Sequence, residues 1–418
     1  MPRIKIDGGH KLSGVINISG AKNSAVALIP ASVLCDEEVT LNNVPNISDV
    51  DALESILIHL NALVRRTGES ISVNCKNVIN NKITEDMSVK LRASYYFMGA
   101  LLSKFKKVDM FFPGGCSIGS RPINLHLDGF KLMGANVIEE GNHFIIEAPK
   151  LHGANINLNF PSVGATINLM LAASKADGET IINNAAHEPE IVNVANFLNE
   201  MGAHIDGAGT SKIVINGVKY LHSAEYEVIP DRIEAGTYLI IGSLLGKNLV
   251  INNLNPEHIM PLINKLKSSG ILMEIGKTSI LVNTISRKKC VNIKTETYPG
   301  FATDLQQPMA AYLTQCDGIS TIHETIYENR FQNLPELGKL GAKYEIKNNN
   351  RKAIIYGKAK LHGNEVIATD LRGGASVLIA ALVASGTTYI DSIHHILRGY
   401  EGIIDKLRNV GAKIEIVE

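Results

Sequence analysis

The segment Asn168-Leu169-Met170-Leu171-Ala172-Ala173 is apolar nearly all round when it is wound as a helix. A helix of that kind belongs inside a fold and not on its surface. The chain of 418 residues holds five similar segments, and successive segments begin 69 to 72 residues apart. The six starts lie at Ala27, Tyr96, Asn168, Tyr238, Pro308 and Val377. This spacing predicts six copies of one structural unit of about 70 residues.

Each copy continues beyond its buried helix in the same way. A strand-like segment such as 180–183 comes next, and an amphipathic helix such as 191–198 follows it. Most copies then have Gly-Ala before two further strands, and glycine is the expected stop after a last helical turn. These pairs lie at 134–135, 202–203, 341–342 and 411–412. The sixth copy reaches residue 418 without its last turn and strand, which residues 3–14 are expected to supply.

The repeat predicts the fold class and the domain organisation. Three buried helices enclosed by sheets make one domain, so six copies predict two α/β domains, each of three βαβαββ repeats. The border is expected between the third and fourth copies. Residues 22–229 would then form one domain, and residues 1–21 together with 230–418 would form the other. A ligand is expected in the cleft between the two domains.

Composition excludes several classes of function. The chain has 41 basic and 41 acidic residues, so it has no bulk charge for binding nucleic acid or an anionic membrane. No run approaches the roughly 18 apolar residues of a membrane span, and the first residues alternate like a strand instead of forming a signal peptide. Five cysteines without a CxxC pair argue against a disulfide framework or a zinc site. We expect a cytoplasmic protein without a metal ion or a cofactor.

Polar residues gather where each buried helix is expected to begin. The first turn of a helix offers unpaired amide donors and the positive end of the helix dipole, which suit an anion. The residues there are Lys22-Asn23, Arg92, Ser162-Val163-Gly164, Asp231-Arg232, Thr303-Asp304 and Asp370-Leu371-Arg372. Ser162, Asp231 and Asp304 are equally compatible with ordinary helix capping. Lys22, Arg92 and Arg372 are poor caps, because a cation opposes the dipole, and we expect them to face a shared anion.

The second copy carries an insertion that the other copies lack. Copies two, five and six each place an arginine ahead of their second helix, at Arg121, Arg330 and Arg398. Only in the second copy do three or four extra residues precede it, in Pro113-Gly114-Gly115-Cys116-Ser117-Ile118-Gly119-Ser120-Arg121-Pro122. The glycines make this loop pliable, and Arg121 could lower the pKa of the Cys116 thiol and bind an anionic substrate. The alternative is a surface turn with an incidental cysteine. The other cysteines, at 35, 75, 290 and 316, are expected to be packing residues.

Several segments together resemble the enolpyruvyl transferases, and the resemblance covers the whole chain. The matching segments are residues 20–24, 112–122, 162–166, 184–192, 301–304, 328–331, 368–372 and 398–401. The resemblance implies two inside-out, barrel-like α/β domains with pseudo-threefold symmetry. It also implies the transfer of enolpyruvyl from phosphoenolpyruvate to the 3′-hydroxyl of UDP-N-acetylglucosamine with release of phosphate, which is the first committed step of peptidoglycan precursor synthesis.

The resemblance also implies roles for individual residues. Cys116 would be the general acid that protonates phosphoenolpyruvate, and Asp304 would lie near the attacking hydroxyl. Lys22 and Arg398 would join them in catalysis. Phosphoenolpyruvate would be held by Lys22, Asn23, Arg121, Arg372 and Arg398. The nucleotide sugar would be held by Arg92, Arg121, Pro122, Ile123, Asn124, Leu125, Ser162, Val163, Gly164, Asp304 and Ile326.

Two rival functions remain open at the level of sequence. One is the sister enzyme 5-enolpyruvylshikimate-3-phosphate synthase, whose pattern lacks the glycine-rich loop with its cysteine. The other is a catalytically silent relative that binds a nucleotide sugar, against which the intact Lys22, Cys116, Asp304 and Arg398 argue. Two positions depart from common members of the family: Asn124 stands where many have aspartate, and Phe160-Pro161 stands where some have Lys-Val.

Overall fold

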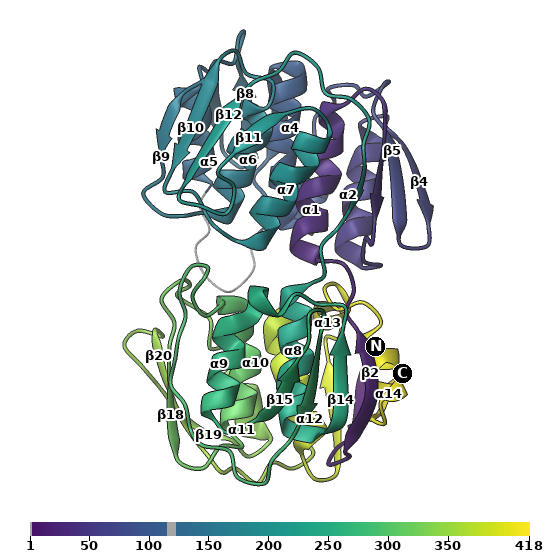
Figure 1. Cartoon of the computed structure of the whole chain (residues 1–418), viewed down its shortest axis with the longest axis vertical. Coiled ribbons are helices and arrows are strands. Elements are labelled where there is room, and N and C mark those ends of the chain that lie inside the picture. The colour runs from purple at the N-terminus through teal and green to yellow at the C-terminus, as the bar shows by residue number, and fades with distance from the viewer. Residues whose placement is uncertain (1, 115–122) are drawn as a thin grey trace. The chain divides into compact units, whose positions relative to one another are not determined.

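The computed structural model describes residues 2–114 and 123–418 of the chain. These residues form two compact units, each an α/β assembly (Figure 1). The first unit consists of residues 20–114 and 123–229, and the second consists of residues 2–19 and 230–418. That these two units are the two domains of the protein stays a prediction.

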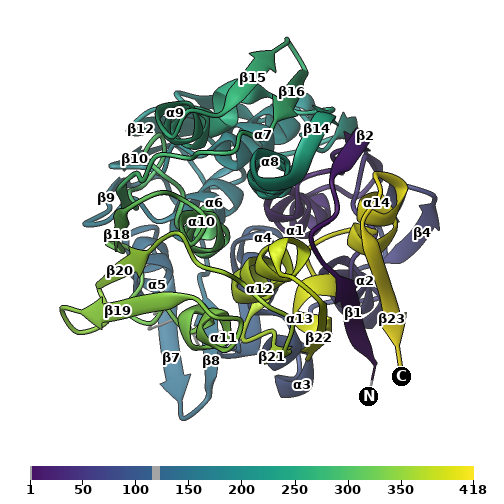
Figure 2. The same ribbon diagram turned by 90° about the horizontal axis from the view of Figure 1, so that it is seen from below.

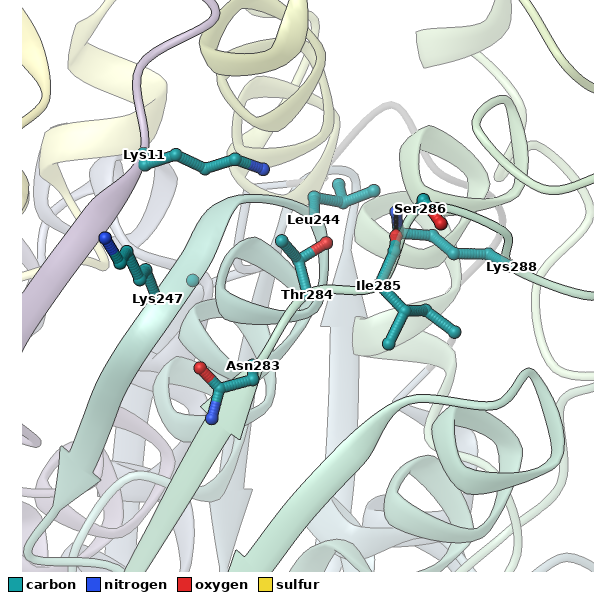
Figure 3. Close-up of a pocket in the computed structure, with 9 residues that line it drawn as sticks. Lys11, Leu244, Lys247, Asn283, Thr284, Ile285, Ser286 and Lys288 are labelled. Atoms are coloured by element: carbon teal, nitrogen blue, oxygen red, sulfur yellow. Dashed lines mark hydrogen bonds between the residues drawn. The ribbon is translucent and has the colours of Figure 1, made fainter.

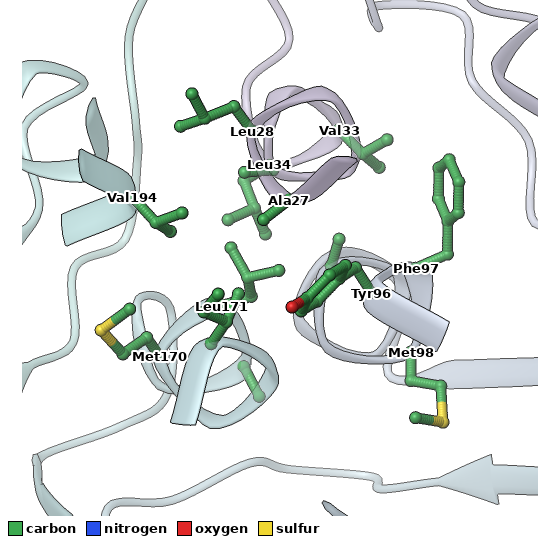
Figure 4. Close-up of a cluster of buried hydrophobic side chains, with 14 of the residues drawn as sticks. Ala27, Leu28, Val33, Leu34, Tyr96, Phe97, Met98, Met170, Leu171 and Val194 are labelled. Atoms are coloured by element: carbon green, nitrogen blue, oxygen red, sulfur yellow. The ribbon is translucent and has the colours of Figure 1, made fainter. Parts of the chain in front are cut away.

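The first unit is built around three buried helices. These are α1 (Lys22–Ala31), α4 (Tyr96–Phe105) and α6 (Val163–Ala173), and α4 packs against both of the others. Figure 4 shows side chains of the three helices facing one another, among them Ala27, Tyr96 and Leu171, all buried. The amphipathic helices are α2 (Ser48–His59), α5 (Asn124–Leu132) and α7 (Pro189–Glu200). Short helices at η1 (Ser32–Leu34), α3 (Glu85–Lys90) and η2 (Arg92–Tyr95) complete the helical part.

Three sheets surround these helices. The first has the order β13-β3-β5-β4, with β3 (Glu38–Asn42), β4 (Leu63–Thr67), β5 (Ser70–Asn74) and β13 (Glu225–Glu227). The second has the order β6-β8-β7, with β6 (Lys107–Phe111), β7 (Asn136–Glu140) and β8 (His143–Glu147). The third has the order β11-β12-β10-β9, with β9 (Asn155–Asn157), β10 (Glu179–Asn183), β11 (His204–Asp206) and β12 (Lys212–Asn216). In the second sheet a single bridge between Ile83 and Met110 takes the place of a fourth strand.

The second unit repeats this arrangement (Figure 2). Its buried helices are α8 (Arg232–Leu245), α10 (Gln306–Leu313) and α12 (Leu371–Val383). Around them lie α9 (Met260–Ser268), α11 (Asn333–Lys339), α13 (His394–Leu397) and α14 (Ile403–Asn409), with short turns at η3 (Pro256–Ile259) and η4 (Thr303–Leu305). The helices and sheets together confirm the expected α/β class with three repeats in each unit.

Its three sheets each have four strands. One has the order β15-β16-β14-β2, with β2 (Leu12–Asn17), β14 (Gly246–Asn252), β15 (Leu272–Ile275) and β16 (Ser279–Asn283). Another has the order β17-β18-β20-β19, with β17 (Ile293–Lys294), β18 (Ile319–His323), β19 (Lys343–Lys347) and β20 (Lys352–Tyr356). The last has the order β21-β22-β1-β23, with β1 (Arg3–Asp7), β21 (Glu365–Ile367), β22 (Thr387–Asp391) and β23 (Lys413–Val417).

The second helix of every copy is followed by a residue in the left-handed region, including the two copies that lack a Gly-Ala pair. Gly134, Gly202, Gly341 and Gly411 adopt φ between +91° and +104°, the left-handed region in which glycine carries no steric penalty. The two copies without Gly-Ala solve the same turn differently. The fourth copy uses Gly270 at φ +97°, and the first uses Asn61 at φ +67°, asparagine being the residue that tolerates this region best after glycine.

The two ends of the chain share one sheet, as the repeat predicted. Strand β1 lies between β22 and β23 and is antiparallel to both, with Ile4 opposite Ile390 on one side and Ile416 on the other. Ile4 and Ile6 are completely buried. In the part of the chain that the structure describes, no helix is long and apolar enough to cross a membrane.

Replacing Ile4 by alanine is expected to lower the free energy of unfolding of the second unit by about 2–5 kcal/mol, because the change leaves a cavity inside the sheet that closes this unit. Urea unfolding followed by circular dichroism would measure the loss. Lys5→Ala is the matched control on the same strand, since the Lys5 ammonium contacts Glu415 at an exposed position, and its unfolding curve should stay close to wild type. Equal curves for Ile4→Ala and wild type would contradict the role of β1.

Candidate active site

In the first unit, the polar residues chosen from the sequence lie at the first turns of buried helices, as expected. Lys22 and Asn23 begin α1, and Arg92 begins the turn η2 that leads into α4. Ser162 is the N-cap of α6, and its hydroxyl accepts a hydrogen bond from the amide of Ala165 at 3.3 Å. For Ser162 the capping alternative is therefore confirmed. The backbone amides of the α6 first turn are then the groups that could bind an anion at this place.

Lys22 forms an ion pair with a carboxylate that sequence reasoning did not single out. Its ammonium lies 2.9 Å from Asp49 Oδ2, and the two side chains are 14% and 6% exposed. Asp49 is the second residue of α2, and Glu190 is the second residue of α7, in the third copy. Aligning the copies at the second residue of their amphipathic helices could have found both carboxylates.

A second cluster in this unit is centred on His126, which is 5% exposed. Its Nδ1 lies 3.0 Å from the amide nitrogen of Asn168 on α6, and its ring packs edge-on against Tyr95. Burial, and to a lesser degree the Arg92 guanidinium, lower the pKa of His126 to about 3. The imidazole is therefore neutral, and it accepts the Asn168 amide.

Gly164 is required by this cluster. A Cβ atom at residue 164 would lie 2.8 Å from Tyr95 Oη and 3.1 Å from a carbon of the His126 ring. Glycine thus lets the first turn of α6 approach Tyr95 and the start of α5. The nucleotide-sugar residues expected on α5 differ in exposure, since Ile123 is 5% exposed and buried in the core, whereas Asn124 is exposed and Leu125 is half-buried. Cys116, Arg121 and Pro122 lie outside the described residues.

In the second unit, Asp304 is held between two arginines. Its Oδ1 accepts a hydrogen bond from Arg330 Nη2 at 2.6 Å, and its Oδ2 accepts one from Arg372 Nη2 at 3.1 Å. The side chains of Arg330 and Arg372 are 3% and 4% exposed, and that of Asp304 is 26% exposed. Asp304 lies inside the turn η4, whose N-cap is Ala302, and the N-cap of the following α10 is Leu305, so Asp304 is not the N-cap residue of either element.

Arg372 was expected to face an anionic ligand, but in the structure it faces a carboxylate of the protein. Its guanidinium is buried, pairs with Asp304 and lies over the Tyr400 ring at 5.3 Å. The cap of this helix is Asp370, which accepts hydrogen bonds from the amides of Arg372 and Gly373 at 3.0 and 3.1 Å. Asp231 likewise caps α8 through the amides of Ile233 and Glu234. Arg372 thus has a carboxylate of the protein itself as its partner.

Glu324 holds Thr303 and the loop that carries Ile326, and no sequence signal had marked it. It is fully buried, and its Oε2 accepts the Thr303 hydroxyl at 3.0 Å, next to Asp304. Its Oε1 accepts the amide of Ile326 at 2.8 Å. Ile326 is half-buried, and Arg398 follows α13 in a half-buried position. One buried carboxylate therefore joins η4 to the loop that carries Ile326.

The chain is similar to known proteins over nearly its whole length. The model of the EPSP synthase (3-phosphoshikimate 1-carboxyvinyltransferase) family matches residues 6–407. A UDP-N-acetylglucosamine 1-carboxyvinyltransferase of Streptococcus pneumoniae is 50% identical over 420 residues, with both chains covered in full. UDP-N-acetylglucosamine 1-carboxyvinyltransferase 2 of Listeria monocytogenes is 48% identical over 412 residues, which cover 99% of this chain and 97% of that protein.

The chain belongs to the enolpyruvyl transferase family. Within this family it groups with the UDP-N-acetylglucosamine 1-carboxyvinyltransferases, which are enzymes.

Solved structures show the same enolpyruvyl transferase fold. The enolpyruvyl transferase NikO of Streptomyces tendae superposes with a TM-score of 0.90 at 25% sequence identity, covering 100% of this chain and 99% of that one. EPSP synthase of Acinetobacter baumannii superposes with a TM-score of 0.77 over the full length of both chains. Its identity of 16% supports the fold alone.

The cysteines of this enolpyruvyl transferase differ in their surroundings. Cys35, Cys75 and Cys316 are buried, and burial raises the pKa of Cys75 to about 12 and that of Cys316 to about 11. A thiol with a raised pKa is a poor nucleophile near neutral pH. Cys290 is exposed, so the expectation that it packs in the interior is wrong. It lies ahead of the edge strand β17, which leaves its side chain uncovered. No cluster of potential metal ligands occurs among the residues that the structure describes.

His126→Gln is expected to remove a pH dependence of stability in the first unit. The unfolded imidazole takes up a proton below about pH 6.5, whereas the folded one does so only near pH 3, so wild type loses stability as pH falls through this interval. Between pH 8 and pH 5 the loss should exceed that of His126→Gln by about 2 kcal/mol. Urea unfolding at both pH values would measure it.

His204→Gln is the control for this experiment, because His204 is exposed on β11 in the same unit. Its pH dependence should follow wild type. If His126→Gln also followed wild type, His126 would have to accept a proton in the folded protein, and the neutral imidazole would be refuted.

Proposed function

We propose that this enzyme transfers the enolpyruvyl group of phosphoenolpyruvate to the 3′-hydroxyl of UDP-N-acetylglucosamine and releases phosphate. The observation that carries the proposal is the Asp304 carboxylate, partly exposed and held in place by two buried guanidinium groups. A fixed carboxylate at the first turn of a buried helix suits a group that must accept a hydroxyl proton. Relatives that are about 50% identical over their whole length carry the name of this activity.

The proposed chemistry divides between a thiol and a carboxylate. The Cys116 thiol donates a proton to C3 of phosphoenolpyruvate, which makes C2 electrophilic. The 3′-hydroxyl oxygen then bonds to C2, and its proton passes to Asp304. The Cys116 thiolate then takes a proton back from C3 as phosphate departs from C2, which restores the thiol and the double bond and gives the enolpyruvyl ether. Fixed guanidinium groups stabilise the charge that develops on the way.

The cations have a second role in this proposal. Lys22, Asn23, Arg121, Arg372 and Arg398 hold the phosphate and carboxylate of phosphoenolpyruvate. Lys22 already neutralises Asp49, and Arg372 already neutralises Asp304. The substrate therefore joins existing ion pairs, so the cations are oriented before it arrives and little side-chain entropy is lost on binding.

The nucleotide sugar is assigned to residues of both units. Arg92, the amides of Ser162, Val163 and Gly164, and residues 121–125 take the uridine diphosphate part, while Asp304 and Ile326 take the sugar. The place of these residues at the first turn of α6 supports this assignment, because the amides of a helix N-terminus suit an anion. Asn124 is exposed and offers an amide where many members of the family offer a carboxylate.

In this proposal the reaction takes place in the cytoplasm and begins peptidoglycan precursor synthesis, which connects the enzyme to cell shape and cell division. Fosfomycin alkylates Cys116. The substrates are small molecules, and neither nucleic acid nor membrane takes part.

Phosphate release from phosphoenolpyruvate tests the proposal. Release is expected only when UDP-N-acetylglucosamine is also present, whereas shikimate 3-phosphate should give none. Cys116→Ser should lose activity, and Cys290→Ser, which changes the exposed cysteine outside the proposed site, should keep it. Release with shikimate 3-phosphate would favour the sister synthase. Binding of UDP-N-acetylglucosamine without any release would favour the silent nucleotide-sugar-binding relative.

Asp304→Asn is expected to lower kcat about 10²-fold to 10⁴-fold, because the amide keeps the shape of the carboxylate but accepts no proton. Steady-state kinetics would measure kcat, and circular dichroism would verify the fold. Asp405→Asn is the matched control, since Asp405 is an exposed carboxylate of the same unit that pairs with Arg408. Turnover of Asp304→Asn within tenfold of Asp405→Asn would exclude Asp304 as the base.

A further inference from the structure

A lysine occupies a position where other copies of the repeat bury a leucine. Lys288, Leu151 and Leu361 are 8%, 2% and 6% exposed. In each of the three copies the next residue along the chain forms an isolated β-bridge at the start of the outer strand. Their carbonyls accept equivalent backbone hydrogen bonds, from Asp177 to Leu151 at 2.9 Å, from Asp317 to Lys288 at 2.7 Å and from Ser385 to Leu361 at 3.0 Å. Lys288 therefore places an ammonium group where the fold calls for an apolar side chain.

The protein stabilises this ammonium only in part. Lys288 Nζ donates one hydrogen bond, to the carbonyl of Ile285 at 2.6 Å. Burial lowers the pKa of Lys288, the ammonium groups of Lys11 and Lys358 add to this shift, and Cys316 and Asp317 oppose it without cancelling it. A buried lysine of this kind destabilises the folded chain unless a counter-charge reaches it.

Lys288 lines a pocket of about 500 Å³ in the second unit. Figure 3 shows that the lining comes from three stretches of the chain: Lys11 ahead of β2, Leu244 to Lys247 where α8 passes into β14, and the stretch from Asn283 at the end of β16 to Lys288. The three lysines bring positive charge to the pocket, and no aspartate or glutamate lines it. Lys11 and Lys247 are exposed, and within the described part of the chain neither forms an ion pair of 4 Å or less.

A polar atom in the pocket wall also lacks a partner. Thr284 Oγ1 is buried, and the residues that the structure describes offer it no hydrogen bond. Buried hydroxyl groups normally have such a partner, so one that lacks it at a pocket wall indicates a group supplied from outside. Asp317 supplies Lys288 with only part of a counter-charge, since its carboxylate is shared with Arg287 at 3.1 Å and Lys358 at 3.4 Å.

We propose that this pocket binds a small molecule carrying a diphosphate, whose oxygens accept hydrogen bonds from Lys11, Lys247, Lys288 and the Thr284 hydroxyl. Two adjacent phosphates match several ammonium groups around one cavity better than a single anion does. The volume is that of a metabolite site and not of an extended macromolecular surface.

This pocket is separate from the Asp304 cluster. Helix α8 begins beside that cluster, where Thr237 contacts Tyr400 under Arg372, and its last turn reaches the pocket at Leu244. Thr237 and Leu244 are seven residues apart on this helix, which corresponds to about 10 Å at a rise of roughly 1.5 Å per residue. Binding at its far end adds a second ligand site to the enzyme.

Amine labelling with residue-level mass spectrometry tests this site without any measurement of activity. Inorganic pyrophosphate serves as the probe, and sodium chloride of equal ionic strength corrects for screening. Pyrophosphate is expected to slow acetylation of Lys11 and Lys247 at least fivefold, and inorganic phosphate or citrate should slow it less. Equal protection by citrate would refute the preference for a diphosphate, and the absence of protection would refute the site.

Variants distinguish the pocket from general binding to a basic surface. Lys288→Leu restores the residue that the other copies use, so it should fold, and pyrophosphate should then slow labelling of Lys247 less than twofold. Lys289→Gln, which changes the exposed neighbour, should keep the full protection. In Lys11→Gln, an exposed change that leaves the core intact, protection of Lys247 should fall at least threefold. Wild-type protection in Lys288→Leu or in Lys11→Gln would overturn the proposal.

Discussion

A helix that is apolar on every side must be enclosed, and most of this structure follows from meeting that requirement six times. In α6 every residue after Val163 is buried, and in α8 every residue after Arg232 is buried. Sheets with one apolar face supply the enclosure: in β8 the buried residues are Phe144 and Ile146, which alternate with partly exposed neighbours. The same requirement explains why the N-terminal strand lies inside a sheet, since the third sheet of the second unit would otherwise lack its central strand.

Enclosure leaves the first turn of each buried helix as the place where polar chemistry can reach the helix. The structure uses it in two ways. Ser162, Asp231 and Asp370 satisfy the amides of their own helices. Lys22 and Asp304 instead pair with charged residues from other segments, and these pairs lie at or near the interior, where an unpaired charge costs several kcal/mol. Charge is therefore kept at these turns only with a partner.

Buried polar groups elsewhere obey the same rule. The neutral His126 accepts the Asn168 amide, and Asn168 in turn accepts the amide of Gly99 at 2.8 Å, so three elements of the first unit are joined by neutral hydrogen bonds. In the second unit the buried Glu234 keeps a raised pKa of about 7, mainly because of burial, although Lys406 donates to it at 2.7 Å. Lys288 stands apart from these groups, since its ammonium has a backbone carbonyl and no carboxylate as a hydrogen-bond partner among the described residues.

The sequence by itself determined the repeat, the α/β class, the closure of the sixth copy by the N-terminal strand and the place of Lys22, Arg92, Ser162 and Asp304 at first turns of buried helices. These are local properties, because the periodicity of apolar residues and the positions of helix stops can be read along the chain. Only the tertiary structure decided the partners. Asp304 meets Arg330 and Arg372, which are 26 and 68 residues away, and Lys22 meets Asp49 on another helix. The packing likewise makes His126 neutral and leaves Cys290 exposed. It also places the side chain of Lys288 where other copies bury a leucine. Such pairings depend on how separate copies pack in space, which the order of residues within any one copy does not specify.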